Sequence, residues 1–195
     1  LGLNQSVNLA SNVTGTLPIA NGGTAITSGF VNGGGLTMVD QFRITANKTI
    51  TSSASTFDAN WERIDTNAQG TLSGGMTESS GIFTFPSTGL YLVDVNLGFG
   101  GLSSISTSDV RYFEFKIMST INNSTYVMVS RMNSFLKYIS NGTYNNLSCS
   151  TILDVTDTAN VKVKFTAEAQ NSVRVAGSTD NNESNEFTFA RLGAT

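Results

Sequence analysis

Alternation of apolar and polar residues is the feature that most limits what this chain can fold into. Every second residue from Tyr91 to Phe99 is apolar, and the same period of two recurs in residues 113–117, 161–167 and 187–189. Such a period is that of a β-strand with one buried face. Turn-forming residues separate the runs, and no helical period of useful length is present. The sequence therefore predicts an antiparallel sandwich or barrel.

The low content of charged residues supports an all-β fold. Only 13% of the 195 residues are charged, against about 25% in an average protein, while 39% are hydrophobic. Ser, Thr, Asn and Gly replace the missing charges. Ser, Asn and Gly disfavour helices, while Thr, Val, Ile and Phe suit a pleated surface. The length is enough for one core, alone or with an arm.

Two compositional zones divide the chain. Residues 1–38 are uncharged, rich in Gly and Asn, and without a period, and we expect them to form an extended arm. Residues 39–195 form the predicted head. The chain begins with Leu1 rather than Met, so we expect a fragment or a processed product. Ten strands are expected in the head, at residues 39–45, 61–65, 82–85, 90–99, 110–119, 124–131, 134–139, 147–155, 161–169 and 186–192.

The segment GIFTFPSTGLYLVDVNLGF, residues 81–99, resembles the central signature of the tumour necrosis factor superfamily and of the globular head of complement component one, subcomponent q. The matching positions are Gly81, Phe83, Pro86, Gly89 and Tyr91. This resemblance implies a ten-strand antiparallel jelly roll that assembles as a homotrimer. On that basis the head core or the trimer interface is expected to contain Phe83, Phe85, Tyr91, Phe113, Phe115, Phe187 and Phe189.

A second segment, NVTGTLPIANGGTAIT at residues 12–27, is similar to one that recurs in bacteriophage tail-fibre and virion-appendage proteins. Three such chains could bury apolar side chains on a common axis, where charges would be stranded from water, while glycines adopt conformations that other residues resist. The resemblance implies a trimerising collar that attaches to other virion proteins. The expected axis or collar residues are Leu17, Pro18, Ile19, Gly22, Gly23 and Ile26.

Several function classes are disfavoured. The chain has no histidine, which removes Ser-His and Cys-His nucleophiles and the commonest metal ligand. The net charge is −3 and lysines and arginines do not cluster, so nucleic acid is a poor partner. No apolar run approaches the roughly 18 residues of a membrane span. The single cysteine, Cys149, is predicted to be a small buried hydrophobe. We therefore expect no enzyme, no cofactor and no membrane insertion.

Two polar segments are candidates for ligand binding. Asp180, Asn181, Asn182 and Glu183 offer oxygen ligands for calcium, although a mobile polar loop is the favoured interpretation. A further segment combines aromatic and amide groups, as carbohydrate sites do, with an ordinary connection between strands as the alternative. This possible receptor-binding loop contains Tyr138, Asn141, Tyr144, Asn145 and Asn146.

The expected function is that of a non-enzymatic virion component, a phage fibre or tail-fibre tip on the particle surface. Three heads on one stalk would attach to host-surface glycan or protein by multivalent binding. The alternatives are a capsid decoration or cement protein without a receptor, and a secreted cytokine-like or complement-like ligand.

Overall fold

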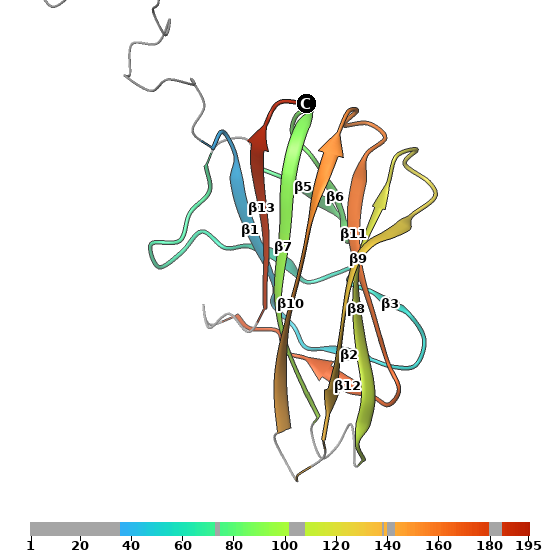
Figure 1. Ribbon diagram of the computed structural model, residues 1–195. Helices are drawn as coiled ribbons and strands as arrows, with labels where there is room; N and C mark the ends of the chain where they lie inside the picture. Colours follow the sequence, from blue (N-terminus) through green and yellow to red (C-terminus); the bar gives the residue numbers. More distant parts are fainter. Residues whose placement is uncertain (1–35, 73–74, 102–107, 138, 140–142, 180–184) are drawn as a thin grey trace, which may run out of the picture. The chain divides into compact units, whose positions relative to one another are not determined.

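The computed structural model describes residues 36–72, 75–101, 108–137, 139, 143–179 and 185–195. These residues form two antiparallel β-sheets without a helix, and hence without one that could cross a membrane (Figure 1). The strands are β1 (Val39–Ile44), β2 (Lys48–Ile50), β3 (Ser55–Thr56), β4 (Trp61–Arg63), β5 (Thr77–Ser79), β6 (Ile82–Thr84), β7 (Gly89–Gly101), β8 (Val110–Thr120), β9 (Val127–Leu136), β10 (Thr143–Val155), β11 (Lys162–Ala169), β12 (Val173–Val175) and β13 (Asn185–Gly193).

The order of the strands is that of a jelly roll. In the first sheet β7 pairs with β10 along one edge and with β13, then β12, along the other. Strand β13 also pairs with β1, which pairs with β4, and β12 also pairs with β2. The second sheet runs β5-β6-β11-β8-β9, with β3 also paired to β11. Figure 1 shows β1, β13, β7 and β10 side by side in one layer.

Aromatic side chains fill the space between the two sheets. The alternation in β7 and β13 turns every second residue inward, and rings from both sheets meet edge to face. Trp61 contacts Phe83 with centroids 4.9 Å apart, and Phe42 contacts Phe83 at 5.1 Å. Burial of each such ring contributes about 1.5–3 kcal/mol. The seven positions predicted for the core or the trimer interface, Phe83, Phe85, Tyr91, Phe113, Phe115, Phe187 and Phe189, are all fully buried here.

Two strand predictions differ from the structure. Residues 124–131 and 134–139 were expected as separate strands, whereas β9 is one continuous strand. It stays paired with β8 along its length because the register between the two strands shifts at two places. The predicted loop around Tyr144, Asn145 and Asn146 is instead the start of β10. These residues pair with the last residues of β7, so the ladder extends beyond the expected strand at 147–155.

The predicted arm, residues 1–38, lies almost wholly outside the described residues. The structure does not describe the predicted collar positions, which are Leu17, Pro18, Ile19, Gly22, Gly23 and Ile26. In the head, Tyr138, Asn141 and the calcium candidates 180–183 also lie outside the described residues. Met38 is described and belongs to the core of the head, where its carbonyl accepts a hydrogen bond from the Arg191 amide at 2.9 Å.

Candidate binding surface

The outer face of the first sheet carries two kinds of surface, one at each end of β7. Because Tyr91, Val93, Val95, Leu97 and Phe99 point into the core, the residues between them point outward. Residues directly opposite on paired strands share a face, so the register defines rows that cross the sheet. The row at Leu92, near the start of β7, is apolar, and the rows from Asp94 onward are polar.

An unbroken apolar row crosses the sheet at Leu92. Leu92 pairs with Ile152 of β10 on one side and with Ala190 of β13 on the other, Ala190 pairs with Val39, and Val39 forms a bridge to Leu72. The end members, Ile152 and Leu72, are 59% and 44% exposed. Leu90 and Leu192 extend the exposed apolar area at the end of the sheet. We call the set Leu72, Val39, Ala190, Leu92 and Ile152 the apolar row.

A second apolar surface lies at the side of the sandwich, between the start of β9 and the end of β10. A hollow of about 390 Å³ is open there, with exposed Val127, Val129 and Ile152 at its walls and buried Leu153 and Val161 among its lining. Ile152 belongs both to this edge hollow and to the apolar row. The two surfaces are therefore adjacent and share Ile152.

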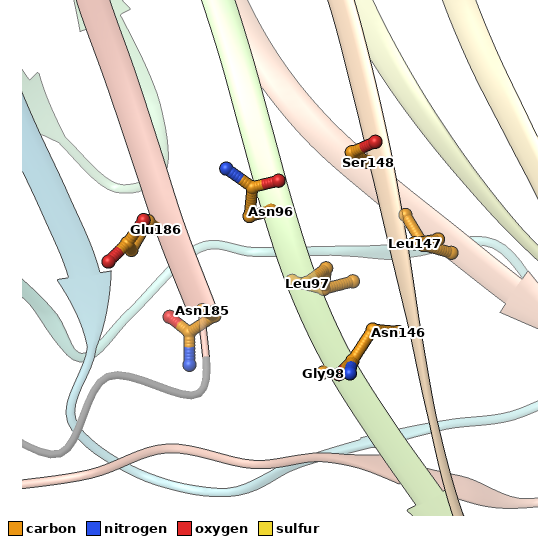
Figure 2. Close-up of a pocket in the computed structure, with 8 residues that line it drawn as sticks. All are labelled: Asn96, Leu97, Gly98, Asn146, Leu147, Ser148, Asn185 and Glu186. Carbon is orange, nitrogen blue, oxygen red and sulfur yellow. The ribbon is translucent and has the colours of Figure 1, made fainter.

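A polar hollow of about 410 Å³ lies on the outer face, over the second half of β7. Figure 2 shows Asn96 on β7 between Ser148 of β10 and Glu186 of β13, and the register places these three in one row. The next row holds Gly98 and Asn146, and the Asn146 side chain extends over the glycine. We call this the polar hollow.

One further row beyond the polar hollow contains Tyr144, Gly100 and Arg174. Gly100 pairs with Tyr144 of β10 and with Arg174 of β12. The Tyr144 ring lies against Gly100, since a Cβ there would be 2.7 Å from its Cδ1 atom. The Nε atom of Arg174 is buried and has no hydrogen-bond partner, and its guanidinium forms no ion pair within the described ranges. An exposed aromatic ring and a cation that no described carboxylate pairs with thus border the hollow.

The predicted receptor-binding loop is divided by this arrangement. Tyr144 and Asn146 point outward beside the polar hollow, while Asn145 turns to the sandwich edge and donates from Nδ2 to Ser134 Oγ and to the Phe135 carbonyl, both at 2.9 Å. Sequence reasoning assigned none of Asn96, Gly98, Arg174 and Glu186 to the binding loop. They come from β7, β12 and β13, and only the strand register could have connected them with Tyr144 and Asn146.

The outer face of the second sheet presents charges that neutralise one another. Lys116 lies 2.5 Å from Glu114 and 3.5 Å from Glu168, and Arg131 also contacts Glu114. The hydrogen bond that the Lys116 ammonium donates to Glu114 raises the pKa of Lys116. In the part of the chain that the structure describes, no three carboxylate or cysteine side chains gather as a metal site would require.

Comparison with known proteins connects this architecture to one family of folds. No protein-family model and no curated protein matches the sequence. Among solved structures, the chain is similar to Eiger TNF from S. frugiperda, with a TM-score of 0.52 and 12% identity over 80% of this chain and 93% of that one. Murine APRIL at pH 5.0 follows, with a TM-score of 0.49 and 10% identity over 80% and 98%. The likeness to Eiger TNF shows a jelly-roll fold of the tumour necrosis factor type.

Proposed function

We propose that this jelly roll is a non-enzymatic binding head that assembles as a homotrimer and acts as a ligand for a partner on a cell surface. The observation that carries the proposal is the apolar row, in which Leu72 and Ile152 are exposed and Leu92 is half-buried on one side of the first sheet. Exposed apolar side chains gathered on one face mark interaction sites. The fold and the sequence resemblance to trimeric jelly rolls both support self-association through it.

The shapes of the two apolar surfaces favour a closed ring. A twofold dimer would pair the same patch on both copies, whereas contact between two different patches builds a ring when the rotation closes. The edge hollow beside Val127 and Val129 and the apolar row meet at Ile152, so one copy can present its edge to the neighbouring copy's sheet. Three copies then complete the assembly that the resemblance implies.

Trimerisation explains how a small head attaches firmly. Three identical binding sites on one particle convert weak single contacts into high avidity when the partner is held on a surface. The partner class that this favours is a cell-surface glycan or protein, which places the working protein outside the cell that it binds.

Cell binding by the labelled full chain tests this function. The head should bind target cells with a half-saturation concentration at least tenfold lower than that of the Leu92→Asp/Ile152→Asp variant, because the variant loses multivalency. Thr77→Asp/Ser79→Asp, at two exposed residues of β5 in the second sheet, is the matched control for two added charges. Equal binding by a demonstrably monomeric variant would contradict multivalent attachment.

A second setting for the same head is a virion fibre tip, and residues 14–24, Thr-Gly-Thr-Leu-Pro-Ile-Ala-Asn-Gly-Gly-Thr, favour it. In that setting the partner cells are bacteria and the arm attaches to other virion proteins. Binding to bacterial rather than animal cells would select this alternative. A decoration or cement protein would instead bind neither, and would raise the melting temperature of empty capsids.

A further inference from the structure

We propose that the polar hollow and the neighbouring Tyr144 form a saccharide-binding site. This inference rests on the proposed function as a binding head and names the chemical class of its ligand. The site follows three successive rows on the outer face of β7, from Asn96 through Gly98 to Gly100. Rows two residues apart are about 6.6 Å from each other, so the site is about 13 Å long.

Glycines make the floor of the site. Gly98 and Gly100 present no side chain on the outer face, whereas their neighbours Tyr144 and Asn146 on β10 rise above the sheet. Glycine within a strand weakens it, and often marks a place where a ligand or another group approaches the backbone closely. Tyr144 already occupies the space over Gly100. The space beside Gly98 remains as the hollow.

The walls carry hydrogen-bonding groups that are not used within the protein. The side chains of Asn146, Ser148 and Glu186 make no hydrogen bond to any described residue, and that of Asn96 makes only a long one, 3.4 Å, to Asp94. Amide, hydroxyl and carboxylate groups together both donate to and accept from hydroxyls. A saccharide offers many hydroxyls and an apolar ring face, and the exposed Tyr144 ring provides the matching apolar surface.

The backbone around the site argues against a peptide as the ligand. Extended peptides are recognised mainly by adding a strand to a free sheet edge. Here β7 is paired with β10 along one edge, and along the other with β13 as far as Leu97 and with β12 at Phe99 and Gly100, so it offers no free edge of strand length. Side chains of the walls and the glycine floor therefore face the ligand. The guanidinium of Arg174, which forms no ion pair with a described residue, lies at the tyrosine end and Glu186 at the other. This arrangement admits neutral sugars, and acidic sugars with the acid group near Arg174.

Calorimetric titration of the full chain with maltotriose, chitotriose and 3′-sialyllactose tests the proposal. At least one probe should bind, and Tyr144→Ala should weaken that binding tenfold or more. Gly98→Thr should do the same by filling the floor while keeping a residue that favours strands. Tyr112→Ala, which removes an exposed tyrosine from the second sheet, is the matched control and should leave the affinity unchanged.

Binding of none of the three probes would overturn the proposal, and so would binding that survives both Tyr144→Ala and Gly98→Thr. Preferential binding of an unstructured peptide in place of the sugars would overturn it as well. Repeating the titration on Leu92→Asp/Ile152→Asp separates the two proposals. Sugar binding by a monomeric variant would support the saccharide site even if multivalent attachment failed. A trimer that binds no sugar would support the proposed assembly and contradict the saccharide site.

Discussion

The guanidinium of Arg63 lies fork-to-fork on the carboxylate of Asp40, with Nε 2.8 Å from Oδ1 and Nη2 3.0 Å from Oδ2. Asp40 is fully buried and also accepts the Met76 amide at 2.7 Å, while Arg63 donates to the Met76 carbonyl at 2.8 Å. The hydrogen bond with Asp40 raises the pKa of Arg63. This pair therefore fastens β1 to β4 and to the segment before β5.

Replacing Asp40 by Ala should lower the free energy of unfolding by about 3 kcal/mol, because the buried Met76 amide and the partly buried guanidinium both lose their acceptor. The double variant Asp40→Ala/Arg63→Met should lose less, since it leaves no unpaired charge. Urea denaturation of both variants measures the difference. If the double variant is the less stable of the two, the pair does not act as described.

Gly81 is required by its backbone conformation. Its φ is +79°, and a Cβ would overlap the Phe57 carbonyl oxygen. Gly81→Ala should cost about 1–3 kcal/mol, the range for a residue forced into such a conformation. Gly70→Ala is the control, because no atom lies within 4 Å of a Cβ there. Thermal unfolding of the two variants should separate them, and equal melting temperatures would contradict the assigned role.

Asp157 gives the fold an acid-sensitive turn before β11. Its Oδ1 accepts the Ala159 amide at 2.7 Å and its Oδ2 accepts Asn160 Nδ2 at 2.6 Å. These hydrogen bonds, the one from the Ala159 amide first, hold the pKa of Asp157 below its ordinary value of 3.8. A lowered pKa in the folded state stabilises the protein above about pH 4, and this stabilisation is lost as the pH falls further.

The Asp157→Asn variant should consequently lose less stability than the wild type between about pH 5 and pH 2. Urea midpoints across that range measure the effect. Asp154→Asn, at an exposed carboxylate without a hydrogen bond to a described residue, is the control. A wild-type acid response in Asp157→Asn would show that the turn carboxylate does not contribute.

Cys149 should be inert in the folded protein. Its thiol is buried in β10 and lies 3.1 Å from Ser130 Oγ. Burial raises the pKa of the thiol, so less of the reactive thiolate is present at neutral pH. Alkylation by iodoacetamide, followed by mass spectrometry, should be more than about tenfold slower in buffer than in urea. Equal rates would mean that the β9–β10 edge opens readily.

The alternation of apolar and polar residues predicted the inward-facing side chains wherever a strand was long enough to show it. Tyr91, Phe113 and Phe115 were identified as inward-facing because at least three apolar residues in each segment repeat with period two. Strands β2, β3, β5 and β12 contain two or three residues and carry no such period.

The candidate site was less accessible to sequence reasoning. Tyr144 and Asn146 were singled out by composition, but their partners depend on which strands become neighbours. Glu186 and Asn96 are opposite one another only because β13 pairs with β7, a contact across about half the chain. Arg174 is similarly brought into line with Gly100 by a short strand that has no distinctive pattern.

The mass of the full chain in solution tests the central claim of a self-assembling head most directly. Light scattering coupled to gel filtration should give three times the chain mass of 20.6 kDa for the wild type. Leu92→Asp/Ile152→Asp should give the mass of a single folded chain, because charges in the apolar row would be buried by assembly. A wild-type protein that remains at 20.6 kDa at micromolar concentration would contradict the account.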